Sequence, residues 1–291
     1  MKDFSELIRL AESRGPKRCI VAGGDDPATI EALKIAYDKG ICNPILIGDE
    51  QTIKKGIADL GYDFSSFTII NGDPARDAVA EVKRNGDFLL KGRLSTPDFL
   101  RAILAPDGLR RNGILSHIAL LEIPGYHKLI FMTDGGMNIS PDLKTKIEIT
   151  KNAIELAHRL GIKNPMVAIL SASEVVDPKL KASVDADSIT RMNRMGELTG
   201  AIISGPLSLD LAISKDAAQK KGIDDPVCGD ADILIVPDVA TGNIFAKGLI
   251  YFANTRAAGI VWGAKLPVVM LSRADPPDMK VLTIALGVTV A

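Results

Sequence analysis

The sequence is poor in aromatic residues and in net charge, and each shortage excludes a class of protein. Only 4% of the 291 residues are aromatic, a content that does not suit an aromatic-rich binding surface. Lys and Arg number 35 against 36 Asp and Glu, so the formal net charge is -1. Without an excess of clustered cations the chain has no general electrostatic affinity for polyanions, and we expect no nucleic-acid partner.

Cysteine is scarce as well, and long apolar runs are absent. The three cysteines show no CxxC spacing and leave one over, which argues against a disulfide framework or a zinc cluster: Cys19, Cys42 and Cys228. The three histidines share no metal-ligand spacing, so we expect no metal site. No run reaches the length of about 18 apolar residues that a membrane span needs. The charged N-terminus has no signal-peptide pattern, and we expect a cytoplasmic protein without a membrane partner.

What the sequence does contain is a series of short apolar runs, most of which lead into segments with helical periodicity. The clearest runs are Arg18–Gly23, Asn43–Ile47, Leu129–Met132, Met166–Leu170, Ala201–Ser204, Ile233–Val236 and Leu266–Leu271. This alternation predicts an α/β fold with mainly parallel sheets covered by helices on both faces. A glycine-rich break near 134–138 predicts two three-layer lobes with a cleft between them, formed by residues 1–137 with 259–291 and by residues 138–258.

In an open α/β sheet ligands bind beyond the carboxyl ends of the strands, so the residues that follow each apolar run are the candidates for a site. The loop after the last run contains Ser272, Arg273, Asp275 and Asp278. These side chains offer a hydrogen-bond donor, a fixed cation for phosphate or carboxylate, and a base. Helix capping by an Asp before Pro-Pro, with the Arg in a surface ion pair, is the alternative interpretation.

A second candidate loop follows the run that ends at Val236. Thr241, the Gly242 N–H group and Asn243 stand before a helix that contains Lys247 one turn further on. Donors at a helix N-terminus would cradle an anion, with the lysine nearby. The loop lacks the Walker A pattern, and a capped turn with a solvated lysine fits the same residues.

Two weaker candidates complete the set. Ser204 and Gly205 follow the apolar run that starts at Ala201, and a glycine there permits close approach of a ligand to the backbone. Lys91 lies directly before a predicted helix and is a candidate cation for binding an anionic substrate, with a solvated surface charge as the alternative. The motifs GxGxxG, HExxH and GxSxG are absent, so the sequence offers no dinucleotide site and no clear covalent nucleophile.

Five ordered motifs together resemble the phosphate acyltransferase family, which comprises phosphotransacetylase and phosphate butyryltransferase. They are KGR at Lys91–Arg93, DGGMNISPDL at Asp134–Leu143, SGPLSLDLAIS at Ser204–Ser214, GDADILIVPDVATGN at Gly229–Asn243 and GAKLPVVMLSRAD at Gly263–Asp275. The similarity runs over roughly residues 18–291 and is strongest in the last two motifs. The stretch Asn164–Asn193 and the SRAD sequence at Ser272–Asp275 resemble the butyryl branch of the family. The TGN sequence at Thr241–Asn243 resembles the acetyl branch.

The resemblance implies an enzyme that transfers a short, butyryl-like acyl group reversibly between CoA and inorganic phosphate through a ternary complex. CoA and acyl-CoA, phosphate and acyl phosphate are then the partners; CoA is a substrate, and no cofactor or metal is bound permanently. It also implies a homodimer or larger assembly. Ser272 and Arg273 match the family's catalytic Ser-Arg pair, and its catalytic Asp corresponds to Asp278 or Asp275. An acetyl-preferring enzyme and a non-catalytic acyl-CoA or acyl-phosphate sensing module remain the alternatives.

Overall fold

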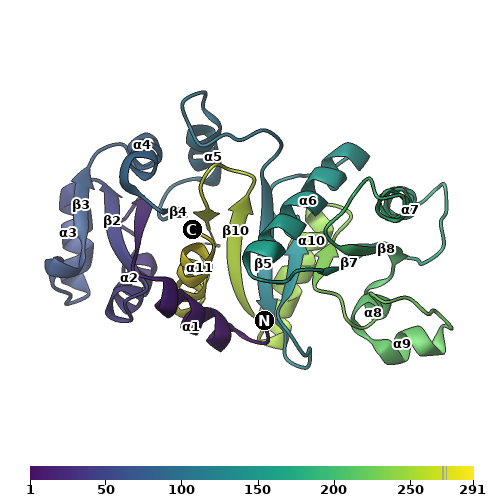
Figure 1. Cartoon of the computed structure of the whole chain (residues 1–291). Coiled ribbons are helices and arrows are strands. Elements are labelled where there is room, and N and C mark those ends of the chain that lie inside the picture. The colour runs from purple at the N-terminus through teal and green to yellow at the C-terminus, as the bar shows by residue number, and fades with distance from the viewer. Residues whose placement is uncertain (271, 273) are drawn as a thin grey trace. The chain divides into compact units, whose positions relative to one another are not determined.

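The computed structural model spans residues 1–291 and describes all of them except 271 and 273. The chain divides into two compact units (Figure 1). Unit 1 comprises Met1–Asp3 with Gly113–Arg256, and unit 2 comprises Phe4–Asn112 with Ala257–Ala291. Strands alternate with helices in both units and most strand pairs are parallel, so the predicted α/β class is confirmed.

Unit 2 is built on a largely parallel sheet. Its strands are, in spatial order, β3 (Thr68–Asn71), β2 (Cys42–Gly48), β1 (Lys17–Ala22), β4 (Phe88–Lys91), β11 (Val268–Val269) and β10 (Arg256–Trp262). Only the β10–β11 pair among these is antiparallel. The central strands carry runs of Val, Ile and Leu because helices cover both of their faces.

The helices of unit 2 lie on the two faces of this sheet. They are α1 (Phe4–Arg14), α2 (Pro27–Asp38), α3 (Glu50–Asp59), α4 (Arg76–Asn85), α5 (Thr96–Leu104) and α11 (Pro277–Val290), with a short 3₁₀ turn at Phe64–Ser66. Figure 1 shows α1, α2 and α11 together on one face and α4 and α5 on the other. Every residue of α11 from Met279 to Val290 is buried, and most of them are apolar, so this helix forms the centre of the unit's core.

Unit 1 has its own set of mostly parallel strands. Its strands are, in spatial order, β5 (Ser116–Glu122), β6 (Ile130–Thr133), β9 (Ile233–Ile235), β7 (Met166–Leu170) and β8 (Ile202–Leu207). Its helices are α6 (Leu143–Arg159), α7 (Lys181–Arg194), α8 (Leu209–Ile213), α9 (Lys215–Lys220) and α10 (Val239–Ala253). Figure 1 shows α6 and α7 on one face of this sheet and α8 and α9 on the other.

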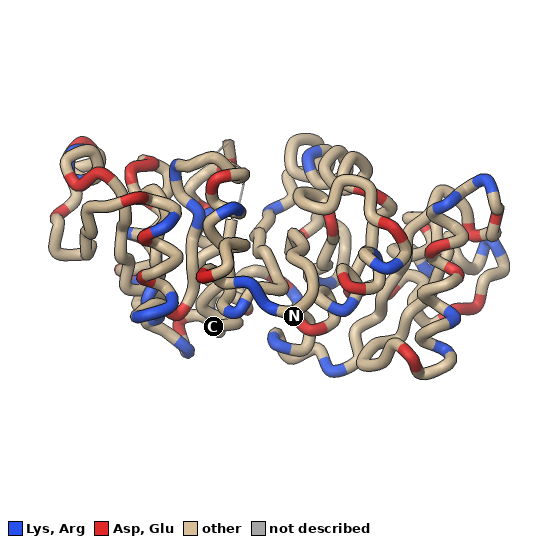
Figure 2. The backbone as a smooth tube through the Cα atoms, turned by 90° about the horizontal axis from the view of Figure 1, so that it is seen from above, with Lys and Arg blue, Asp and Glu red and all other residues tan. Residues whose placement is uncertain are grey.

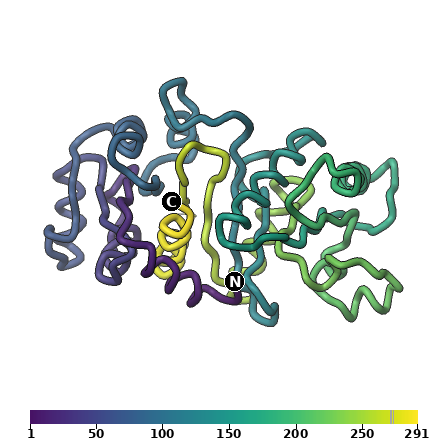
Figure 3. The backbone as a smooth tube through the Cα atoms, viewed as in Figure 1, coloured from purple at the N-terminus to yellow at the C-terminus, as the bar shows by residue number. Residues whose placement is uncertain are grey.

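The units divide the chain after Asp3, after Asn112 and after Arg256, whereas the sequence placed the divisions after residues 137 and 258. The move of the first predicted division from residue 137 to Asn112 has a simple cause. β6 runs parallel to β9, with Phe131 opposite Ile233, and β5 pairs with β6, so both strands belong to the sheet of unit 1. Figure 3 shows the start of the chain beside the segment around Leu129, where the Leu129 N–H group donates to the Met1 carbonyl (3.1 Å).

Charged residues of both signs are interspersed along the two units (Figure 2). No single-sign tract appears among the residues drawn there, in keeping with the formal net charge of -1. Within the described part of the chain, no helix has both the length and the apolar character needed to cross a bilayer.

Candidate functional site

The strand order of unit 2 creates a switch point between β1 and β4. The chain moves outward from β1 through β2 to β3 and then returns to β4 on the other side of β1, so the loops after β1 and β4 leave toward opposite faces. These two loops cross closely. Gly92 donates its N–H to the Ala22 carbonyl (2.8 Å), and Arg93 donates its N–H to the Gly23 carbonyl (2.7 Å). Only glycine fits at position 92, because a Cβ there would collide with the Gly23 carbonyl oxygen.

Charged side chains gather at this switch point. Lys91, predicted to bind an anion, ends β4 and is only 8% exposed. Arg93 places Nη1 3.5 Å from an Asp25 carboxylate oxygen, and Lys280 places Nζ 3.6 Å from Asp26. Fixed charge of both signs is what a site for a phosphate group with a proton acceptor nearby requires.

The loop after β11 lies next to this group of charges. The register of β11 on β4 pairs Val269 with Leu90, so both strands end at the same edge of the sheet. Ser272 donates its N–H to Asp275 Oδ2 (2.8 Å), and Ala274 donates its N–H to Ser272 Oγ (3.3 Å). Asp275 is largely buried, and the hydrogen bond that its carboxylate accepts fixes the backbone of Ser272.

The other two predicted catalytic residues are Arg273 and Asp278. Arg273 lies outside the described residues. Asp278 is exposed in the first turn of α11, where the helix dipole stabilises a negative charge. Ser272, Asp275 and Asp278 thus come from one junction between β11 and α11, and their catalytic roles stay predictions.

In unit 1 the donors predicted to cradle an anion are engaged in capping α10. Asp238 accepts hydrogen bonds from the N–H and the hydroxyl of Thr241, both at 2.8 Å, and these lower the pKa of its carboxyl. The Gly242 N–H donates to the Asp238 carbonyl (3.1 Å), and the Asn243 amide donates to the Gly135 carbonyl (3.3 Å). The interpretation as a capped turn therefore describes the first turn of this helix, and anion binding here stays a prediction.

The remaining predicted binding residues of unit 1 do not lie in that turn. Ser204 and Gly205 lie within β8, before its carboxyl end. Ser204 donates its hydroxyl to Asp225 (2.7 Å), and a Cβ on Gly205 would lie 2.8 Å from the Cβ of Ile169. The Gly205 contact serves the packing of β8 on β7, and the Ser204 hydrogen bond joins β8 to the segment between α9 and β9. Lys247 is exposed on α10.

A buried ion pair lies between α6 and α7. Lys146 and Asp185, with side chains 5% and 8% exposed, approach to 2.8 Å, and Lys181 reaches the same carboxylate at 2.5 Å. Burial acts to raise the pKa of Asp185, but the hydrogen bonds from the two lysines bring it below its usual value. Lys146 also contributes to the lowered pKa of Asp238, so this cluster lies near the start of α10.

The three cysteines are free and buried. Cys19 and Cys42 lie on the neighbouring strands β1 and β2, and burial raises the pKa of the Cys19 thiol. Burial also raises the pKa of Cys228. A raised pKa leaves a thiol protonated, and a protonated thiol is a poor nucleophile. Among the described residues, no group of three or more His, Cys, Asp or Glu side chains is placed to hold a metal ion.

The sequence did not single out an apolar pocket at the carboxyl edge of the unit 1 sheet. Its volume is about 260 Å³. Its walls are Leu170, Ala172, Leu209, Val236, Pro237 and Phe245, with the hydroxyl residues Ser171 and Thr241. The apolar runs Met166–Leu170 and Ile233–Val236 both end at this edge of the sheet. Only the strand order shows that the loops after them, which follow β7 and β9, are neighbours.

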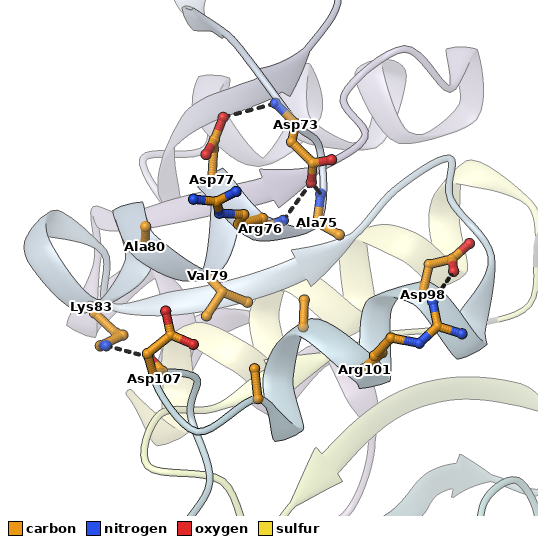
Figure 4. Close-up of a pocket in the computed structure, with 12 residues that line it drawn as sticks. Asp73, Ala75, Arg76, Asp77, Val79, Ala80, Lys83, Asp98, Arg101 and Asp107 are labelled. Atoms are coloured by element: carbon orange, nitrogen blue, oxygen red, sulfur yellow. Dashed lines mark hydrogen bonds and ion pairs between the residues drawn. The ribbon is translucent and has the colours of Figure 1, made fainter.

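A larger groove lies between α4 and α5 of unit 2 (Figure 4), with a volume of about 590 Å³. Its floor includes Val79 and several alanines, and charges of both signs surround it. Several of these charged side chains have partners: Asp73 accepts from the Arg76 N–H (2.7 Å), Asp98 pairs with Arg101 (2.6 Å), and Lys83 donates to the Asp107 carbonyl. The described residues that line the groove carry charges of both signs, so they offer a small ligand no concentration of one sign.

Comparison with known proteins agrees with a phosphate-handling α/β protein. A family profile described as phosphate acetyl/butaryl transferase matches residues 3–85 and 68–288. The chain is 37% identical to the phosphate butyryltransferase of Clostridium acetobutylicum, over 100% of this chain and 99% of that protein. It is 36% identical to the phosphate acetyltransferase of Thermotoga maritima, over 99% of both. A crystal structure of a branched-chain phosphotransacylase from Enterococcus faecalis V583 superposes with a TM-score of 0.85 at 32% identity, covering 94% of this chain and 98% of that one.

Proposed function

Because the chain belongs to the phosphate acetyl/butaryl transferase family, we propose that it transfers a short acyl group reversibly between CoA and inorganic phosphate. In one direction the thioester C–S bond breaks, a C–O bond to phosphate forms, and the phosphate's proton ends on the CoA sulfur. In the other direction the CoA sulfur attacks the acyl phosphate and phosphate leaves. Similarity over the whole length to both butyryl- and acetyltransferases carries this proposal.

The loop after β11 would provide the catalytic groups. Arg273 would hold the phosphate through a charge-assisted pair of hydrogen bonds, and Ser272 would donate to the oxygen on which charge develops. An ordinary thiol has a pKa of about 8.5, so little thiolate exists at neutral pH. A carboxylate that accepts the thiol proton as sulfur attacks would contribute about 10²–10⁴-fold in rate.

Asp275 and Asp278 are the two candidates for that base. Asp275 already accepts the Ser272 N–H (2.8 Å) and is largely buried, whereas Asp278 is exposed at the helix start. A group that must take up a proton needs a free oxygen facing substrate, which favours Asp278. Replacing each by Asn separates them. Loss of the base lowers kcat while the protein stays folded, whereas loss of the turn at Asp275 also lowers stability.

The anion site would include Lys91. It lies at the switch point of unit 2, at the sheet edge where the loop after β11 begins, and its charge would favour phosphate over neutral molecules. We keep Thr241, Gly242, Asn243 and Lys247 as proposed contacts of the second substrate in unit 1, together with Ser204 and Gly205. A butyryl-like acyl group is the proposed substrate, and an acetyl preference is the alternative.

A direct assay tests the proposed function. Purified protein is mixed with CoA and, in turn, with acyl phosphates from acetyl to valeryl, and thioester formation is followed. We expect turnover with at least one of them, and Arg273→Ala should lower kcat/KM for acyl phosphate by about 10²–10³-fold. Binding of acyl-CoA without any turnover would replace this proposal by the sensing module.

We also propose that the protein forms a homodimer through α10. This helix is rich in apolar residues, yet only Gly242 is buried, while Ile244, Tyr251 and Phe252 are 72%, 65% and 92% exposed. Two aromatic side chains bury about 150–250 Å² each, which together is about half of the roughly 800 Å² per partner that a stable interface needs. A second copy with the same patch is the simplest partner, because a two-fold axis brings the patch onto itself.

Sedimentation equilibrium tests the dimer. Phe252→Glu should convert it to monomer, and Phe64→Glu, at a half-exposed phenylalanine of unit 2, should leave it intact. A monomeric parent protein would contradict the proposal. A cytoplasmic location is proposed as well, supported by three buried cysteines that are all free thiols.

A further inference from the structure

The apolar pocket of unit 1 lies at a second switch point. From β6 the chain runs through α6 to β7 and through α7 to β8, and then returns through α8 and α9 to β9, which lies between β6 and β7. Right-handed connections place α6 and α7 on one face and α8 and α9 on the other, as Figure 1 shows. The loop after β7 leads to α7, whereas the loop after β9 leads to α10, which lines the pocket together with Leu209 of α8. Adjacent loops that leave toward opposite faces open the crevice in which α/β proteins bind ligands.

The chemistry of the walls restricts what this crevice accepts. No charged side chain is among the described residues that line it, and Leu170, Leu209, Val236 and Phe245 contribute apolar walls. The hydroxyl of Thr241 is directed to Asp238 at 2.8 Å, so it is engaged within the protein. Amide or phosphate groups placed here would lose water without gaining matching partners, whereas an alkyl group would gain by leaving water.

The size of the pocket restricts the ligand further. Its volume of about 260 Å³ is below the range of roughly 300–1,000 Å³ of sites that hold a whole drug-sized molecule. A fragment of a few carbon atoms fits such a space, and a complete cofactor does not. Among the substrates of the proposed function, the acyl chain is the only purely apolar part.

We propose that this pocket receives the acyl chain of the substrate, and that Leu209 and Ala172 limit the chain length it accepts. This inference rests on the proposed function. Leu209 is half-buried at the start of α8, and Ala172 lies just after β7, at an exposed position where a larger side chain does not disturb the core. A smaller side chain at Leu209 would therefore enlarge the pocket, and a larger one at Ala172 would fill part of it.

The test compares two pocket variants with a matched control. Ala172→Leu narrows the pocket, Leu209→Ala widens it, and Ile213→Ala makes a similar truncation on α8 at a residue that does not line it. For each protein, kcat/KM is measured with acyl phosphates from acetyl to hexanoyl, and the KM for CoA is measured separately.

We expect Ala172→Leu to lower kcat/KM for butyryl and longer chains by about tenfold or more, with acetyl changed less than about twofold, because one methylene in an apolar pocket discriminates by about 10–200-fold. Leu209→Ala should move the preference toward longer chains, and Ile213→Ala should leave it unchanged. A uniform change at every chain length would overturn the inference, as would a rise in the KM for CoA alone, which would place the pantetheine arm in the pocket.

A binding measurement separates this inference from the proposed function. The affinities of butyryl-CoA and of free CoA are measured by calorimetry for the parent protein and Ala172→Leu. The inference expects the difference between the two ligands to shrink in the variant, whether or not the parent protein turns over. An unchanged difference contradicts the acyl pocket, whereas absence of turnover in the parent contradicts only the proposed function.

Discussion

The switch points of the two units share a topology but present opposite chemistry. In unit 2 the loops after β1 and β4 bring together Lys91, Arg93, Asp25, Asp26 and the nearby Lys280. In unit 1 the loops after β7 and β9 surround an apolar pocket, and none of the described residues that line it is charged. Strand order determines where a crevice opens, and the residues that follow each strand determine what it binds.

The difference extends to how the charges around each switch point are arranged. In unit 1 the charges near α10 are paired away from the pocket: Lys146 with Asp185 at 2.8 Å, and Asp238 with the first turn of α10. In unit 2 the closest approach of Lys280 to Asp26 is 3.6 Å. The pairing in unit 1 leaves the proposed acyl pocket apolar, and the charges at the switch point of unit 2 suit the proposed phosphate site.

The largest effect should come from breaking the buried ion pair of unit 1. Asp185→Asn leaves Lys146 buried without its counter-charge, and we expect the free energy of unfolding to fall by about 3–5 kcal/mol. Urea denaturation followed by circular dichroism measures it. The matched control is Asp187→Asn on the same helix, where a partly exposed pair with Arg191 should contribute no more than about 1 kcal/mol. Equal effects from the two variants would show that burial does not distinguish these pairs.

A second prediction concerns the charged switch point of unit 2. Lys91→Met removes a cation at the end of β4, and we expect kcat/KM for phosphate to fall by about 10–100-fold, because a hydrogen bond to a charged group contributes about 1.5–3 kcal/mol. The preference among acyl chains should not change. Lys55→Met, at an exposed position on α3, serves as the control. A change in acyl-chain preference would contradict the proposal that phosphate binds at the switch point of unit 2 and the acyl chain at that of unit 1.

The cap of α10 tests whether unit 1 also binds an anion. Asp238→Ala removes the acceptor for the Thr241 N–H, and we expect a loss of about 1 kcal/mol in stability, with Asp238→Asn close to the parent. Thermal unfolding measures the loss. The KM for phosphate should remain the same in both variants. Tighter phosphate binding in Asp238→Ala would mean that the freed donors at this helix start form an anion site.

The smallest effect is the pH dependence of stability that unit 1 contributes. Folding lowers the pKa values of Asp185 and Asp238 from their ordinary value of 3.8. The two carboxylates therefore stabilise the fold at pH values above 3.8, and this stabilisation is lost as the pH falls through their pKa values in the folded protein. Urea midpoints measured between about pH 2 and 5 should therefore fall less steeply for Asp238→Asn than for the parent. Parallel curves would show that this carboxyl does not contribute to the acid sensitivity.

Part of this architecture could be predicted from the sequence, because strands and helix starts depend on local patterns. The run Met166–Leu170 is a strand with the bounds predicted, and Asp26 before Pro27 begins α2 as a capping residue. Ser272 and Asp275 follow β11 as expected, and Asp278 lies in the first turn of α11. Period and capping depend on near neighbours in the chain, so they are readable without knowledge of the fold.

Other features depended on which strands become neighbours. The sequence grouped Gly113–Met137 with the first lobe, but the pairing of β6 with β9 places these residues in unit 1. Ser204 and Gly205 were candidates for substrate binding, and the structure shows them packed within β8. Their residue types alone do not distinguish these roles, because a glycine needed for close strand packing looks the same as one needed for a ligand.

By itself, the sequence determined the α/β class, the neutral charge balance and the loop after β11 that the family resemblance identified. Only the tertiary structure decided that the loops after β7 and β9 enclose a pocket, since β8 and two helices separate those strands along the chain. It also decided that Asp238 and Thr241 satisfy each other. Patterns along the chain report on local structure, whereas a binding pocket arises from segments that meet only after the sheet has formed.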